Sequence, residues 1–200
     1  MKERGMIFNG EMVRALLDGR KTQTRRPIKW KQTRFTEIGE REDGSKWPWS
    51  EDAEHACDFW HPCPFGAVGD RIWVRETWAD AGASAPDLKL YRANYPEHVP
   101  SIYENVPPAK EIRWTPSIHM PRTASRILLE ITGVRVERLQ SITLGDICKE
   151  VGCGLYDFRP ATHGFQVWEE LWKSIYGAES WNTNPWVWVI EFKLVEGGAA

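Results

Sequence analysis

Apolar residues recur with the spacing of a helix in two segments, residues 10–18 and 165–176. Asn9 can cap the first segment, and Gly19 follows it where a left-handed residue commonly ends a helix. In the second segment an apolar stripe lies at positions i, i+3, i+4 and i+7: Trp168, Leu171, Trp172 and Ile175. We predict a helix in each segment, and a shorter third helix from Thr143 to Glu150 that ends at Gly152.

Alternation of apolar and polar residues, which is typical of strands, marks three further segments. It runs through residues 71–75 and 126–139, where Gly133 can mark a bulge or bend. In residues 186–194 the large apolar side chains share one face and predict a half-buried strand: Trp186, Trp188, Ile190, Phe192 and Leu194. Short strands with interspersed helices favour an α+β fold, a small mixed β-barrel with flanking helices.

Two stretches show neither the helical spacing of apolar residues nor the alternation that is typical of strands. Residues 36–64 are acidic and rich in tryptophan, and residues 80–114 are rich in proline, tyrosine and asparagine. We interpret both as irregular insertions over the surface of a single domain, residues 1–200, and a lid is one role open to the first.

Composition narrows the class of protein. The chain has 12 tryptophans, more than an average protein of 200 residues, so we expect a tryptophan-rich core with a few rings free to stack on bases. Neither a run of membrane-spanning length nor the apolar core of a signal peptide is present, so we expect a cytoplasmic protein without membrane contact.

The four cysteines form no CxxC pair. Cys57 and Cys63 have His55 and His61 nearby, which leaves a zinc site open, but the spacing is atypical of one. We therefore predict neither a metal nor a cofactor.

Positive charge is concentrated near the N-terminus. The formal net charge is −2, yet residues 20–34 contain seven Lys or Arg residues and no acid. This pattern indicates an anion or nucleic-acid contact, and complementation of the first helix's C-terminus is a simpler reason for Arg20 and Lys21.

Three residues suggest chemistry. Thr24 is a nucleophile if a base takes its proton, and Lys21 can be that base if burial and neighbouring arginines lower its pKa. The same residues can equally grip a phosphate without reaction. Glu150, near a helix C-terminus, suits a general acid or base, with a solvated glutamate as the alternative. Glu76 is a rival carboxylate, or an ion-pair partner of a neighbouring arginine such as Arg75.

The residues from Gly19 onward, with Lys21 and Thr24, resemble the GxKxxTxR signature of the ASCH (activating signal cointegrator homology) family. The order of the predicted elements is also similar. The resemblance implies a PUA-like β-barrel and an association with RNA and modified nucleosides. One small bacterial member removes acetyl from N4-acetylcytidine, and its lysine, threonine and glutamate would match Lys21, Thr24 and Glu150. Other members are RNA-binding proteins or ribonucleases, and the longer form is similar to proteins of phages and prophages.

Three functions follow as alternatives. The first is a hydrolase of a modified nucleoside or RNA, with Lys21, Thr24 and Glu150 as catalytic residues. The second is a module that binds RNA or DNA, single strands included, with or without ribonuclease activity. The third is a phage accessory protein that binds another protein through its insertions. Seven residues are predicted to bind substrate or nucleic acid: Arg20, Arg25, Arg26, Arg75, Glu76, Arg122 and Arg126.

Overall fold

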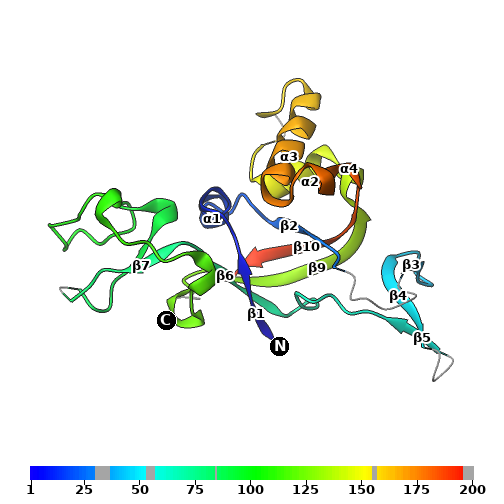
Figure 1. The fold of residues 1–200 in the computed structure, drawn as a ribbon, viewed down its shortest axis with the longest axis horizontal. Coiled ribbons are helices and arrows are strands. Elements are labelled where there is room, and N and C mark those ends of the chain that lie inside the picture. Colours follow the sequence, from blue (N-terminus) through cyan, green and yellow to red (C-terminus); the bar gives the residue numbers. More distant parts are fainter. Residues whose placement is uncertain (30–36, 53–56, 84, 155–156, 196–200) are drawn as a thin grey trace.

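The computed structural model describes residues 1–29, 37–52, 57–83, 85–154 and 157–195, and an open five-stranded sheet forms its centre (Figure 1). The strand order is β1-β6-β9-β10-β2, with only the β1–β6 pair parallel. The strands are β1 (Glu3–Ile7), β6 (Arg71–Arg75), β9 (Leu128–Arg138), β10 (Trp186–Leu194) and β2 (Gln23–Pro27). With the helices described below, this arrangement confirms the α+β class.

The edge strands β1 and β2 do not pair through their backbones within the described ranges, so the sheet does not close into a hydrogen-bonded barrel. A side chain connects them instead, since Arg26 on β2 donates to the Ile7 carbonyl at the end of β1 over 2.7 Å. The predicted strand at 126–139 is one long strand. Its register with β10 shifts because Glu191 pairs with Gly133 but Phe192 pairs with Ile131, which confirms the bulge expected at Gly133.

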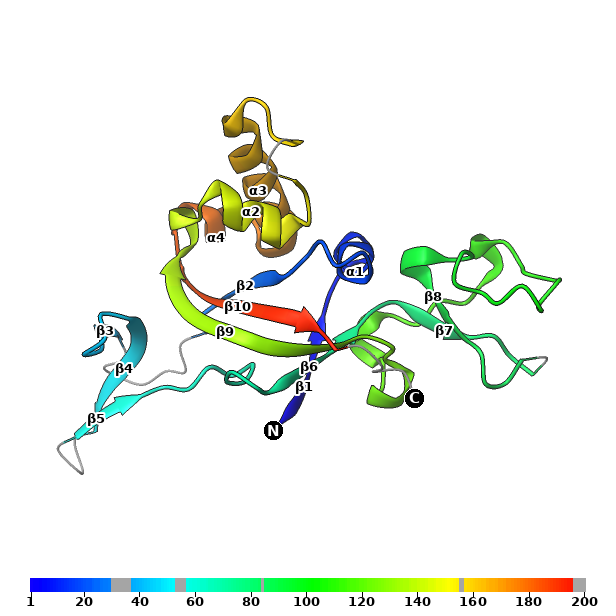
Figure 2. The ribbon, with the colours of Figure 1, turned by 180° about the vertical axis from the view of Figure 1, so that it is seen from behind.

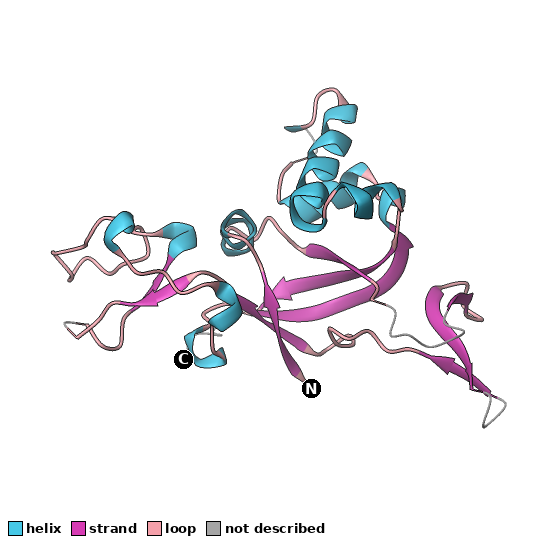
Figure 3. Ribbon diagram, in the orientation of Figure 1, coloured by secondary structure: helices cyan, strands magenta, loops and turns pink. Residues whose placement is uncertain are grey.

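In the described part of the chain, four α-helices accompany the sheet: α1 (Gly10–Leu17), α2 (Leu144–Val151), α3 (Ala161–Tyr176) and α4 (Ala178–Asn182) (Figure 3). The predicted caps are confirmed. Asn9 accepts from the Met12 amide and Thr143 from the Asp146 amide, and Gly152 ends α2 in the left-handed conformation. Helix α3 begins at Ala161, earlier than its apolar stripe indicates. None of the described helices has the length and apolar character needed to cross a membrane.

Both faces of β10 are buried from Val187 to Ile190, whereas Lys193 and Leu194 at its end are exposed, so the prediction of a half-buried strand is wrong for the first part of the strand only. Trp188, Ile190 and Phe192 belong to a core with β6 and β9. On the opposite face, Val187 and Val189 pack in a second core with α2 and α3, and neither has any exposed area. A strand that lies between two packed layers has both faces buried there. The prediction relied on Glu191 and Lys193, which follow the buried stretch.

The first insertion is not irregular, which corrects the prediction. Strands β3 (Glu37–Glu40), β4 (Lys46–Asp52) and β5 (Cys57–Trp60) form a three-stranded antiparallel sheet. Aromatic packing replaces simple alternation here: the Trp47 ring lies 5.0 Å from that of Trp188 in an edge-to-face contact, and Arg41 stacks on Trp47.

The second insertion is mostly irregular, as predicted. It contains a two-stranded sheet of β7 (Trp78–Asp80) and β8 (Lys89–Tyr91), followed by 3-10 turns at Arg92–Asn94 and Ala109–Glu111. Further 3-10 turns occur at Ser117–His119, Arg122–Ala124 and Leu139–Ser141. The two insertions extend from opposite ends of the central sheet (Figures 1 and 2).

Candidate functional site

Strand β2 carries the basic signature into the interior rather than onto an open surface. Lys21, Gln23, Thr24 and Arg25 are each at most 2% exposed. This corrects the expectation of an accessible cationic segment. Buried charges of this kind need partners, because desolvation of an isolated ion is costly. The partners come from distant parts of the chain.

Lys21 meets Glu150, as the catalytic hypothesis requires. The Lys21 Nζ lies 3.4 Å from Glu150 Oε1 and donates to the Gln23 carbonyl over 2.7 Å and to the Glu150 carbonyl. Burial is the main cause that lowers the pKa of Lys21, with Arg26 and Arg25 acting in the same direction and Glu150 opposing them. The Lys21 Nζ therefore has three oxygen acceptors around it, an environment that suits the protonated ammonium form.

The segment 20–22 caps the C-terminus of α2, not only that of α1. Besides the bond from Lys21, the Thr22 amide donates to the Lys149 carbonyl over 3.1 Å, and the Arg20 guanidinium donates to the Gly152 carbonyl. Positive charge at the carbonyl end of a helix is favourable. The predicted charge complementation therefore operates on a helix that lies far away in sequence.

The Glu150 carboxylate is buried, so the alternative of a solvated glutamate is wrong. Its Oε1 accepts from the Arg25 amide over 3.0 Å. Its Oε2 lies 3.7 Å from Arg25 Nη1 and has no hydrogen-bond partner in the described part of the chain. One oxygen is thus held in place while the other retains its full capacity to accept a proton or a hydrogen bond.

Arg25 is held by carboxylates and is unavailable to a substrate phosphate. Its side chain has no exposed area, and Nη2 lies 3.1 Å from Glu137 Oε2 and 3.5 Å from Asp146 Oδ2. In the amide orientation that satisfies both of its polar atoms, Gln23 donates to Asp146 Oδ1 over 3.0 Å and accepts from Arg25. The expectation that Arg25 binds an external anion is therefore not supported by its contacts.

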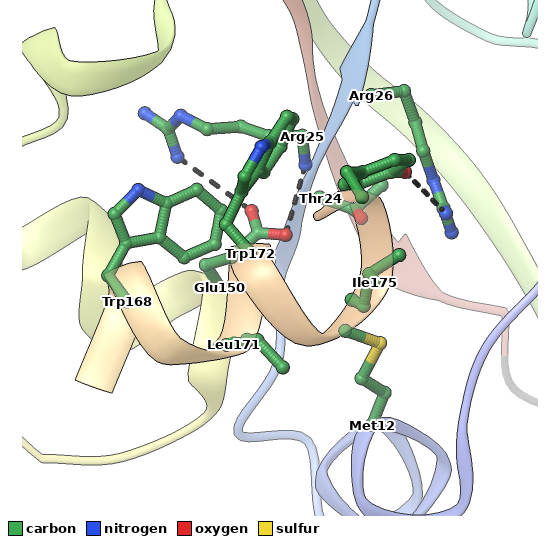
Figure 4. A pocket seen from close by; sticks show the side chains of 10 residues that line it. Met12, Thr24, Arg25, Arg26, Glu150, Trp168, Leu171, Trp172 and Ile175 are labelled. Carbon is green, nitrogen blue, oxygen red and sulfur yellow. Dashed lines mark hydrogen bonds and ion pairs between the residues drawn. The ribbon is translucent and has the colours of Figure 1, made fainter. Parts of the chain in front are cut away.

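A narrow pocket lies beside this cluster, between β2, α2 and α3 (Figure 4). Water-sized molecules can reach about 10 Å³ of it, which is room for about one water. Its walls include Thr24 and the Glu150 carboxylate, whereas Lys21 is not part of them. The remaining lining residues are Met12, Arg25, Arg26, Trp168, Leu171, Trp172, Ile175 and Tyr176.

Sequence reasoning did not assign the α3 side chains to this site. Trp168 and Trp172 are buried, as the core interpretation of the stripe predicts, but they also line the pocket. Tyr176, whose ring centroid lies 4.4 Å from that of Trp172, accepts a hydrogen bond from Arg26 Nη1 over 3.2 Å. Only the polar hydroxyl on the last residue of α3, Tyr176, could have indicated this role.

The other predicted binding residues lie outside the pocket. Arg20 pairs with Asp18 at 2.7 Å, and Arg122 pairs with Glu3 at 2.9 Å. Arg75 donates to the carbonyls of Ser117 and Ile118. Of the predicted arginines, only Arg25 and Arg26 line the pocket that contains Thr24 and Glu150.

Glu76 forms a buried ion pair, but its partner is Arg126 and not the adjacent Arg75. Arg126 Nε and Nη2 donate to the two oxygens of Glu76 over 2.9 and 3.0 Å. Arg126 also donates to Asn94 Oδ1 and stacks over the Tyr91 ring. Glu76 and Arg126 are therefore partners of each other rather than of the Lys21 cluster.

No three of His, Cys, Asp and Glu gather into a metal site within the described ranges, and His55 falls outside them. Burial raises the pKa of the Cys63 thiol to about 11, which opposes formation of the thiolate that zinc would need. The His61 Nε2 lies 2.9 Å from the Ser50 hydroxyl.

Comparison with known proteins adds no relative: no family model matches the chain, and neither a curated protein nor a solved structure matches it.

Proposed function

We propose that the protein is a hydrolase that removes an acyl group from a modified nucleoside, similar in chemistry to the N4-acetylcytidine amidohydrolase of the ASCH family. The same proposal assigns the domain to the PUA-like folds. One observation carries it: the Glu150 carboxylate is buried beside Lys21 and lines the same pocket as the Thr24 hydroxyl. A hydroxyl, a carboxylate and an ammonium from distant segments are the parts that covalent acyl transfer uses.

Thr24 is the nucleophile in this proposal. Its Oγ1 forms a bond to the amide carbonyl carbon while its proton passes to the free oxygen of Glu150. The C–N bond then breaks, and the proton on Glu150 goes to the departing amine. Water hydrolyses the remaining threonine ester and releases the carboxylic acid, so that one water is consumed for each acyl group removed.

Glu150 replaces Lys21 as the group that handles the proton. Lys21 does not line the pocket, and its Nζ is surrounded by oxygen acceptors. It acts through Glu150 as a positioning residue that holds the carboxylate in place. Direct proton transfer from Thr24 to Lys21 remains the alternative, and it requires a neutral Lys21.

Arg26 is the best-placed residue to stabilise the developing oxyanion. It lines the pocket, and its buried Nε has no hydrogen-bond partner among the described residues. An unpaired donor beside a reacting carbonyl can strengthen its bond as negative charge develops on the oxygen. Tyr176 accepts from Arg26, which leaves the tyrosine O–H free to donate as well.

Substrate entry requires the α3 side chains to move, because the pocket now admits only about one water. Ile175 is 42% exposed and forms part of the wall, so it lies at the mouth. In the described residues no hydrogen bond joins the Thr24 hydroxyl to Glu150 or Lys21, and such contacts commonly tighten only when substrate binds.

The direct test is incubation with N4-acetylcytidine and chromatographic detection of cytidine. We expect Thr24→Val and Glu150→Gln to lower kcat by at least about 100-fold, a typical contribution of such groups. Thr22→Ala is the matched control, because Thr22 is an exposed threonine of the same segment. Equal inactivity of the wild type and Thr24→Val over long incubations would show that this proposal is wrong.

Fewer structural observations support nucleic-acid binding through residues 20–34 than support the hydrolase. Lys29 is exposed, but Arg20, Lys21, Arg25 and Arg26 are all engaged with other parts of the protein, and Trp30, Lys31 and Arg34 lie outside the described ranges. The test is binding to a short single-stranded RNA, which must weaken steeply with salt if phosphates are neutralised. The protein-binding alternative stays a prediction.

A further inference from the structure

A second cavity lies on the opposite side of α1 from the acyl-transfer pocket. Met12 lines the first pocket, whereas Gly10 and Arg14 line the second, together with Glu76, Thr77, Arg92 and Ala93. Water-sized molecules can reach about 230 Å³ of it, enough for several waters at about 30 Å³ each. It is therefore much roomier than the pocket at Thr24.

The walls of this cavity are held in place by hydrogen bonds among three segments. Arg14 on α1 donates to the Ala93 carbonyl over 2.7 Å. The Arg92 amide donates to the Thr77 carbonyl over 3.0 Å. The cavity is thus formed by α1, the chain that follows β6 and the 3-10 turn Arg92–Asn94, and does not depend on a single element.

Positive charge exceeds negative charge around the cavity. Glu76 is the only acid among the described residues that line it, and both of its oxygens already accept from Arg126. Arg14 and Arg92 then remain as two guanidinium groups without a carboxylate partner in the described structure. Arg92 is exposed, and its side chain forms no hydrogen bond or ion pair with any described residue.

We propose that this cavity binds a phosphate group. Guanidinium groups present forked donors that match phosphate oxygens in pairs, and the free Arg92 with the anchored Arg14 supplies two such groups around one space. The Thr77 hydroxyl is a further donor in the lining. The phosphate is either free or carried by a small molecule such as a nucleotide. This site is independent of the acyl-transfer proposal, and its success or failure leaves that proposal untouched.

The experiment is calorimetric titration of the full chain with inorganic phosphate, a nucleoside 5′-monophosphate and the corresponding nucleoside, all at constant ionic strength. We expect saturable binding of at least one phosphate-bearing ligand that exceeds the binding of the nucleoside. Arg92→Gln should weaken it by about tenfold or more, the usual effect of removing a charged hydrogen-bond donor. Arg92→Lys should bind with an affinity between those of the wild type and Arg92→Gln, because lysine keeps the positive charge but not the forked pair of donors.

Arg113→Gln is the matched control, since Arg113 is also an exposed arginine and does not line the cavity. Because Arg92 is exposed and its side chain forms no hydrogen bond or ion pair with a described residue, its variants should unfold at the wild-type temperature, and loss of binding then cannot be ascribed to misfolding. Binding of inorganic phosphate identifies a free anion as sufficient, and binding of the monophosphate alone identifies a nucleotide. Absence of saturable binding for both, or equal affinity in the wild type and Arg92→Gln, would overturn the proposal.

Discussion

Lys21 and Glu150 are 129 positions apart in the sequence, and their side chains lie 3.4 Å apart in the interior. The pair joins β2 to α2 and holds the carboxylate that faces the pocket. Neither residue can be removed without leaving the other charge buried, and such a loss typically costs about 3–5 kcal/mol.

Lys21→Met should therefore destabilise the protein by about 3 kcal/mol, whereas Lys149→Met should change stability by less than about 1 kcal/mol because Lys149 is exposed. Denaturant unfolding measures both. In the double variant Lys21→Met/Glu150→Met the loss should be smaller than the sum of the single losses. Additive losses would show that the two charges do not interact.

The pH dependence of stability should reveal the lowered pKa of Lys21. Its folded pKa lies below the ordinary 10.5, so between these values the unfolded chain binds more protons than the folded one. Lys21 therefore contributes stability that rises with pH across that alkaline interval. We expect the wild type minus Lys21→Met difference in unfolding free energy to rise with pH, and a flat difference would contradict the shift.

A positioning role for Lys21 has its own kinetic signature. If Lys21 only holds the Glu150 carboxylate in place, the variant Lys21→Met should lower kcat for N4-acetylcytidine hydrolysis by less than Glu150→Gln does. If Lys21 is itself the base, that variant should instead abolish the reaction at every pH. Denaturant curves recorded under the assay conditions ensure that only folded enzyme is compared.

Ile175 should control access to the Thr24 pocket. Ile175→Ala removes part of the wall at the mouth, and we expect it to lower KM for the nucleoside by severalfold without lowering kcat. The stability cost should stay below about 1.5 kcal/mol because the side chain is 42% exposed. Ile118→Ala is the control, since Ile118 is 58% exposed and lies outside the pocket. An unchanged or raised KM in Ile175→Ala would contradict this role.

Gly164 should be needed for the close approach of α3 to α2. A Cβ at this position would lie 2.5 Å from Leu144 Cδ1 and 2.9 Å from the Phe158 ring. We expect Gly164→Ala to destabilise the protein by about 1–2 kcal/mol, since overpacking exceeds the gain of about 1 kcal/mol in helix propensity. Gly145→Ala in α2 is the control, because its Cβ would meet nothing closer than 3.9 Å. It should be neutral or stabilising in a thermal melt.

Local signals in the sequence were sufficient for much of the fold. The caps at Asn9 and Thr143, the turn at Gly152 and the bulge near Gly133 each depend on a few adjacent residues, and all four are confirmed. The three-stranded sheet at one end was missed because its strands are stabilised by contacts such as Trp47 with Trp188, which are distant in sequence.

The environment of the candidate site was less accessible to sequence reasoning. The meeting of Lys21 with Glu150 was predicted from the resemblance to a family signature and is observed. The burial of Arg25 was not foreseen, because a strand of consecutive charged and polar residues looks exposed until its carboxylate partners Glu137 and Asp146 are placed beside it.

The turn after α1 has a consequence for how the domain opens. The amides of Arg20 and Lys21 both donate to the Ala15 carbonyl in α1, while their side chains donate to carbonyls at the end of α2. Residues 20 and 21 thus cap the C-termini of two helices that are remote in sequence. Fraying of either one exposes unpaired carbonyls on the other, so their last turns belong to a single cooperative unit. The pocket, which Met12 of α1 and Glu150 of α2 both line, is assembled or lost with that unit.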